Sequence, residues 1–427
     1  MNNKSGITAN TKKSYFFPMI IISSLFFIYG FVTWLNGILI PYLKIACQLS
    51  DFQASFVAFA LYISYTIMAL PSSWILKRTG LKNGMMVGLW VMAVGTIIFI
   101  PAAMLRTYSI FLIGLFVMGT GLAILQTASN PYVTIMGPKE SAARRISILG
   151  IANKAAGAIA PLILAYYILN DGDAFIANLS TMNFADQNTA LNELARRVIN
   201  PYIVMTIVLF VLGFIIRLSN LPDLEMESND DIQEDQIKPK KNILEYPHLI
   251  LGAIALFFYV GVEVIAGDMI IRYGLSLGIE MDKAKAFTSY TMATMVLGYI
   301  LGIVLIPKII SQQFALKVSA SLGILFALGA IFTSGFTSVI FVALFGLSNA
   351  IVWPAIWPLA LHNLGKFIKT GSALLIMAIS GGAILPLLWG TLSDMFGAQN
   401  AYWIMVPGYL MILFYSVKGY KTRSWTS

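Results

Sequence analysis

The chain has 427 residues, of which 58% are hydrophobic and only 11% are charged, a balance that excludes an ordinary soluble enzyme. Its formal net charge of +9 could indicate nucleic-acid binding. However, most Lys and Arg fall in loops and tails that we assign to one side of a membrane, so the charge instead indicates topology. The single cysteine, Cys47, excludes an intramolecular disulfide and argues against a cysteine-ligated metal cluster.

Twelve apolar stretches are long enough to cross a bilayer, which takes about 20 residues per helix. In chain order they lie near 17–43, 54–76, 84–104, 108–136, 145–169, 199–219, 247–274, 286–307, 314–335, 337–362, 370–393 and 399–417. Together they use most of the chain and leave no room for a soluble catalytic domain. We therefore expect an all-α membrane protein with twelve transmembrane helices and no enzymatic activity.

The highly charged stretch 220–246 follows the sixth span and divides the chain in two. We predict an N-terminal six-helix bundle at 1–219, a cytoplasmic linker at 220–246 and a C-terminal six-helix bundle at 247–427. The other long connection, roughly 170–198, is expected to be an external loop. Two related, pseudo-symmetric halves of six helices are typical of secondary transporters, which bind substrate near the membrane midplane between the halves.

Two opposite charges, Lys154 and Glu263, lie deep inside predicted spans, where charged side chains are costly and usually functional. Lys154 lies roughly 15 Å and Glu263 roughly 21 Å along its helix from the inner surface, at about 1.5 Å per residue. We predict that they are electrostatic partners across the two halves, and that a cation or sugar makes or breaks the pair. The alternative is a static pair that holds the bundle together.

Asp268 lies four residues before Arg272, so a local ion pair at the external mouth explains it adequately. It is also the second candidate, after Glu263, for coupling to a cation. His248 and His362 fall near helix ends and are expected to be interfacial residues instead of proton carriers.

Four segments carry a family resemblance. They are Leu35–Pro41, Gln126–Val133, Tyr259–Gly261 and His362–Gly365. In order and spacing they resemble bacterial sugar permeases, specifically the fucose/glucose–galactose branch of the major facilitator superfamily. The resemblance implies alternating access and the uptake of a monosaccharide, commonly by cation symport.

The chain departs from the fucose permeases of this branch at two positions. The fucose permeases carry an aspartate where this chain has Gly37 and a glutamate where this chain has Gln126. Both carboxylates that the resemblance associates with proton coupling and fucose binding are therefore missing. Gln126 favours the glucose/galactose type, whose members also resemble this chain in carrying a glutamate at the position of Glu263.

A hexose offers a ring of hydroxyls and an apolar face, so its site needs convergent polar groups and a flat aromatic surface. Gln126 and Asn130 share one helical face because they are four residues apart. The expected substrate-binding residues are Asn36, Gln126, Asn130, Asn153, Asn349, Trp353 and Trp357, with Asn153 included by resemblance. The alternatives are amides that bond neighbouring helices and tryptophans that pack or face lipid.

The sequence thus predicts a transporter that imports a neutral hexose, glucose or galactose first, with fucose or an N-acetylhexosamine next. Lys154, Glu263 and Asp268 are the cation-coupling candidates, with H⁺ or Na⁺ co-transported and no bound cofactor or metal. We expect a monomer in the bacterial inner membrane, surrounded by lipid, with both termini cytoplasmic and no nucleic-acid partner. The rival hypotheses are an uncoupled facilitator and a polytopic sugar sensor.

Overall fold

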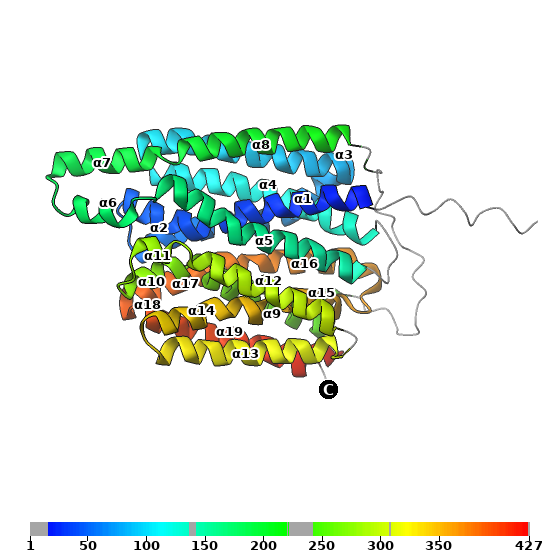
Figure 1. Ribbon diagram of the computed structural model, residues 1–427. Coiled ribbons are helices and arrows are strands. Elements are labelled where there is room, and N and C mark those ends of the chain that lie inside the picture. The colour runs from blue at the N-terminus through cyan, green and yellow to red at the C-terminus, as the bar shows by residue number, and fades with distance from the viewer. Residues whose placement is uncertain (1–15, 136–141, 220, 222–241, 307–308, 426–427) are drawn as a thin grey trace, which may run out of the picture.

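The computed structural model describes the chain except for residues 1–15, 136–141, 220, 222–241, 307–308 and 426–427. Most of the predicted linker at 220–246 therefore lies outside the described residues. Within the described part, the regular elements are all helical, and the long helices run side by side along one axis (Figure 1).

In the first half of the chain the helices are α1 (Phe16–Trp34), α2 (Asn36–Ala46), α3 (Asp51–Leu105), α4 (Tyr108–Ile135), α5 (Ala142–Ile168), α6 (Gly172–Leu179), α7 (Phe184–Arg196) and α8 (Ile199–Leu218). In the described residues, eleven helical stretches are long and apolar enough to span a membrane. One of them, α3, has 55 residues and would be about 80 Å long if straight, far more than one crossing needs. It turns at Gly80, whose φ of 74° suits glycine, so α3 contains both the second and the third predicted spans.

In the second half the helices are α9 (Pro247–Asp268), α10 (Ile270–Ser276), α11 (Met281–Ala284), α12 (Phe287–Leu305), α13 (Gln312–Phe332), α14 (Gly335–Asn349), α15 (Val352–Leu361), α16 (Ile368–Met377), α17 (Gly381–Phe396), α18 (Ala398–Ala401) and α19 (Met405–Val417). Short 3-10 turns lie at Ile243–Glu245, Gly365–Phe367, Ala378–Ser380, Tyr402–Ile404 and Gly419–Lys421. With α3 counted as two spans, the observed crossings agree with the twelve that the sequence predicts.

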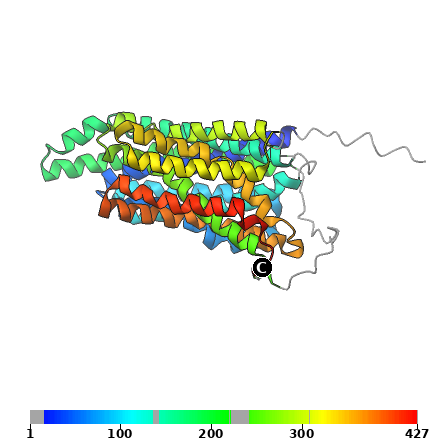
Figure 2. The same cartoon turned by 90° about the horizontal axis from the view of Figure 1, so that it is seen from below.

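Helices from the first half of the chain gather on one side of the molecule and helices from the second half on the other (Figure 1). The start of α1 and the C-terminus lie at one end, which we call the terminal end. Helices α6, α7, α10 and α11 lie at the opposite end, which we call the α6–α7 end (Figures 1 and 2). The predicted external loop at 170–198 is instead folded, because α6 and α7 occupy most of it and extend beyond the main body.

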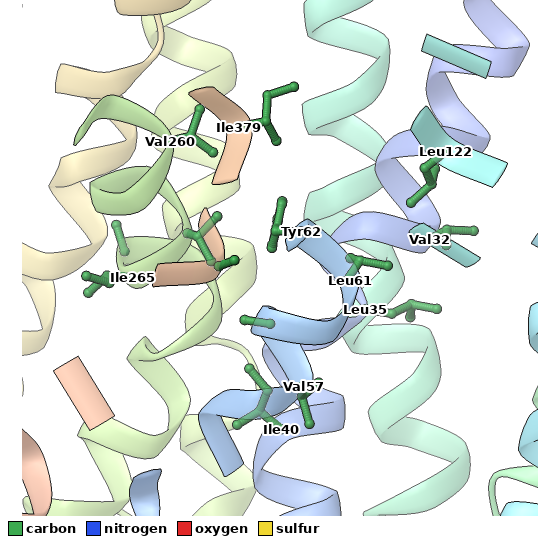
Figure 3. Packing of buried hydrophobic residues seen from close by; sticks show 14 of the residues in the cluster. Val32, Leu35, Ile40, Val57, Leu61, Tyr62, Leu122, Val260, Ile265 and Ile379 are labelled. Atoms are coloured by element: carbon green, nitrogen blue, oxygen red, sulfur yellow. The ribbon is translucent and has the colours of Figure 1, made fainter. Parts of the chain in front are cut away.

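The two halves meet chiefly where α3 packs on α17 and where α5 packs on α12. Apolar side chains fill this contact. Figure 3 shows Tyr62 of α3 between its own half and Val260 and Ile379 of the other half, and all three are buried. Polar side chains within this contact are therefore removed from water and from lipid, and they are the place to look for function.

Candidate functional site

An ion pair joins the two halves of the chain. Lys154 of α5 donates a hydrogen bond from Nζ to Oε1 of Glu263 on α9 across 2.8 Å. Both residues are buried, with exposed fractions of 8% for Lys154 and 9% for Glu263. The structure therefore confirms the predicted contact. Such a pair persists in a low-dielectric interior only if each charge compensates the other, because the cost of removing either from water is several kcal/mol.

Trp34, the last residue of α1, supports the lysine. The Lys154 Nζ atom lies 4.3 Å from the centre of the indole ring, a geometry that stabilises a desolvated cation. The Trp34 Nε1–H donates to Oδ1 of Asn153 across 3.4 Å, and the Asn153 amide donates to the Phe26 carbonyl across 3.4 Å. Asn153 therefore packs α5 against α1 beside the ion pair, as an amide that bonds a neighbouring helix would.

Several tyrosines lie within electrostatic range of Glu263, and as a group they were not predicted from the sequence. Tyr259, one helical turn before Glu263, interacts with the carboxylate. The tyrosines within its electrostatic range are Tyr29, Tyr62, Tyr259, Tyr299 and Tyr409, from α1, α3, α9, α12 and α19. They come from both halves, and their hydroxyl groups can both donate and accept hydrogen bonds. Of these tyrosines, Tyr259 alone was noted in the sequence, as part of the segment Tyr259–Gly261 that carries the family resemblance.

Asn36 begins α2 directly after the break that ends α1 at Trp34. It is 1% exposed, and its Nδ2 atom has no hydrogen-bond partner among the described residues. The next residue is Gly37, at the position where the fucose permeases have an aspartate. A Cβ atom on Gly37 would collide with the Thr288 hydroxyl of α12, which donates to the Gly267 carbonyl across 2.7 Å. A side chain at this position would therefore push the two halves apart.

Gln126 and Asn130 are both half-buried on α4, one turn apart as predicted. Gln126 lies beside the Tyr29 hydroxyl, which links it to the tyrosines around Glu263. Asn130 lies one turn nearer the terminal end on the same helix. The structure thus connects Gln126 to the surroundings of Glu263 through Tyr29.

Helix α14 ends at Asn349 and α15 begins at Val352, so the predicted tenth span is broken at its polar residue. The Asn349 Oδ1 atom accepts a 2.9 Å hydrogen bond from Tyr409, whereas its buried Nδ2 atom has no partner in the part of the chain that is described. Buried polar atoms are nearly always bonded, so exceptions call for an explanation such as an absent ligand. Asn36 and Asn349 thus each present a spare donor.

Trp353 and Trp357 stack on one another, with ring centres 5.2 Å apart and planes at 24°. Trp353 also lies 6.4 Å from the ring of Tyr259 in a tilted arrangement. Both indoles are half-buried and packed against the core, which argues against simple lipid-facing residues. Through Tyr259 this aromatic stripe is continuous with the surroundings of Glu263.

The predicted ion pair between Asp268 and Arg272 is wrong. Arg272 pairs with Asp51 of α3 instead, across 3.1 Å, and donates to Ser55 across 3.3 Å. Asp51 is available because its helix begins at the same end of the molecule, and a partner from another helix outcompetes the residue one turn away. Asp268 is left fully buried, and neither carboxylate oxygen has a hydrogen-bond partner within the described ranges.

Carboxylates from each half close the α6–α7 end. Asp394, near the end of α17, accepts from the backbone N–H groups of Asp51 and Phe52 across 3.0 and 2.9 Å, at the start of α3. Asp173 of α6 accepts from the N–H groups of Met281 and Asp282 across 2.7 and 2.9 Å, at the start of α11. Each carboxylate caps a helix of the other half, where the dipole favours negative charge. We call Asp51, Asp173, Arg272 and Asp394 the end seal.

An apolar hollow on the molecule is separate from the ion pair. It opens between α1, α5 and α8 and is lined mainly by apolar residues such as Phe27, Ile148 and Val208. Such a surface suits lipid chains better than a sugar.

At the terminal end, the His248 Nε2 atom lies 2.9 Å from the His362 carbonyl oxygen. This contact joins two helix ends, as expected of structural histidines.

The sequence of this chain matches the family model of the Major Facilitator Superfamily over residues 22–385. This chain belongs to that superfamily. It is 35% identical to a glucose/galactose transporter of Brucella abortus, over 99% of this chain and 98% of the relative. It is 28% identical to an L-fucose-proton symporter of Escherichia coli, over 91% and 90%.

Among solved structures, the fold is similar to that of the superfamily transporter FucP in its outward conformation. The TM-score is 0.73 at 27% identity, with 97% of this chain and 100% of the other covered. The all-helical major facilitator fold expected from the sequence is therefore confirmed, and the chain is a multi-pass membrane protein of a transporter superfamily.

Proposed function

We propose that this protein imports a neutral hexose across the bacterial inner membrane by cation symport, with alternating access to a site between its two halves. Both termini would face the cytoplasm, so the α6–α7 end would be external. The observation that carries the proposal is the buried Lys154–Glu263 pair between the halves. A charged pair in this position has a cost that a static bundle could avoid with apolar side chains.

The groups around the pair suit a sugar. Asn36 and Asn349 each hold a spare amide donor inside the bundle, and Gln126 adds a third amide. The Trp353 indole supplies the flat surface that stacks on sugar C–H groups. Asn130, Asn153 and Trp357 complete the proposed site, and Asn153 acts by holding α1 beside Lys154. We propose a carrier and not an enzyme.

The likeness to a glucose/galactose transporter makes these two sugars the first substrates to test, with fucose and N-acetylhexosamines next. Lys154, Glu263 and Asp268 would couple sugar movement to a cation. We propose a monomer in contact with lipid. The competing function is an uncoupled facilitator, in which the Lys154 ammonium permanently takes the place of a transported cation.

Purified protein in liposomes tests the proposal, with a panel of labelled sugars under separate proton and sodium gradients. We expect glucose or galactose to accumulate above the external concentration when the coupled gradient is imposed. Equilibration without accumulation under every gradient would favour the facilitator. Failure of all the sugars to move, even in exchange, would contradict sugar transport itself.

A further inference from the structure

Lys154, Glu263 and Asp268 are buried charged groups of the transmembrane contact, and of these three Asp268 lacks a hydrogen-bond partner among the described residues. Lys154 contributes one positive charge, and Glu263 already holds it at 2.8 Å. Asp268 is fully buried, and both of its oxygens lack a hydrogen-bond donor among the described residues. An ionised carboxylate without a donor or counter-ion is among the costliest groups to bury, so such groups are neutralised instead.

The position of Asp268 on its helix adds to this cost. It is the last residue of α9, where the helix dipole places negative partial charge that disfavours an anion. The charged and titratable groups that act on it are Glu263 on its own helix, Lys154 on α5 and Tyr62 on α3. Glu263 repels a second negative charge. Arg272 of α10, the nearest further cation along the chain, is held by Asp51.

We propose that Asp268 is the residue that carries the transported proton, and that Glu263 serves as the fixed partner of Lys154. This inference rests on the proposed function and reverses the order in which the sequence ranked the two carboxylates. Protonation adds one H⁺ to a carboxylate oxygen and cancels its charge without requiring any further ligand. A sodium ion would instead need several oxygen atoms around it.

The place of Asp268 between Glu263 and the end seal suggests how loading is controlled. It lies five residues beyond Glu263, about 7.5 Å nearer the α6–α7 end. Four residues further, Arg272 belongs to the end seal. When the seal opens, Asp268 would be the first transmembrane carboxylate reached from outside. Closing the seal around the neutral acid then encloses no net charge, because Lys154 and Glu263 cancel.

The test compares Asp268→Asn with Glu263→Gln and with the control Asp186→Asn, an exposed carboxylate in the first turn of α7. In liposomes, Asp268→Asn is expected to retain sugar counterflow. It should lose sugar-induced alkalinisation outside, and its accumulation ratio under a proton gradient should fall to equality. Asp186→Asn should behave as the unchanged protein. Retained proton movement in Asp268→Asn, or accumulation by the unchanged protein under a sodium gradient alone, would overturn the proposal.

If Asp268→Asn fails to transport at all, infrared spectroscopy of the purified protein still tests whether Asp268 is protonated. At neutral pH the unchanged protein should show the carbonyl band of a protonated carboxylic acid, which Asp268→Asn loses and Glu263→Gln retains. A band absent from the unchanged protein, or lost only in Glu263→Gln, contradicts the assignment. This measurement needs no sugar, so it separates failure of the Asp268 assignment from failure of the proposed sugar transport.

Discussion

Lys154 and Glu263 show how far single residues can be interpreted from a sequence of this kind. Their depth within apolar spans predicted a contact between the halves, and the 2.8 Å pair is present. Asp268 was also identified, but its assigned partner was wrong. The reason is physical: spacing along one helix reveals which neighbours are within reach, whereas the choice of Asp51 by Arg272 depends on how α3 and α10 meet.

Removing one member of the ion pair leaves the other charge buried alone. Lys154→Gln and Glu263→Gln should each lower the free energy of unfolding by about 3–5 kcal/mol, whereas the double variant should recover much of that loss. Thermal melting in detergent measures the cycle. Strictly additive losses in the double variant would mean that the two side chains do not stabilise one another.

The stacked indoles make a second prediction for single residues. Trp353→Ala should raise the KM for the transported hexose about tenfold, equal to about 1.4 kcal/mol, and Trp353→Phe should raise it less because a ring remains. Trp74→Ala is the matched control, since Trp74 is 55% exposed on the outside of the bundle. Equal KM values for Trp353→Ala and the control would remove Trp353 from the sugar site.

At the scale of elements, apolar runs predicted the long helices well, but they did not predict how the connections fold. Residues 170–198 were expected to form a loop because their polar composition breaks the apolar pattern. In fact Asn183 caps α7 through Asp186, while Leu191 and Leu194 turn inward. That short amphipathic pattern was present in the sequence. The capping of α11 by Asp173 could not be predicted, because it joins segments more than 100 residues apart.

The end seal predicts a shift in conformation. Asp394→Asn weakens two hydrogen bonds to a charged acceptor, and we expect the α6–α7 end to open about tenfold more often. The labelling rate of Thr288→Cys, in a Cys47→Ser background, by an impermeant maleimide reports this opening. Asp282→Asn is the control because its carboxylate pairs with the nearby Lys285, and the variant keeps the backbone N–H that Asp173 binds. Unchanged labelling in Asp394→Asn would show that Asp394 does not hold the seal.

The α6–α7 extension makes a pH-dependent prediction. Arg197 binds the Asp171 carboxylate and holds its pKa below the usual range of an aspartate. Since the folded pKa is the lower one, the contact stabilises the extension above the unfolded pKa, and this stabilisation is lost as pH falls through the folded value. Asp171→Asn should therefore speed hydrogen exchange in α6 at neutral pH and have little effect at strongly acidic pH. An equal effect at both would contradict this.

For the whole molecule, the number of spans and the family were predictable because bilayer thickness fixes helix length and the motifs keep their order. The site was only partly predictable. The amides and tryptophans attracted attention as polar or bulky residues in apolar helices. The tyrosines around Glu263 did not, because each resembles an ordinary core residue until five helices bring them to one carboxylate. Convergence of this kind is a property of the packed halves.

The most direct test of the account is an experimental structure of the protein with galactose or glucose bound. The sugar is expected to lie between the two halves with its ring against Trp353. Its hydroxyl groups would bond the spare amide donors of Asn36 and Asn349, close to the Lys154–Glu263 pair. A sugar bound elsewhere, with both amides and Trp353 untouched, would contradict it.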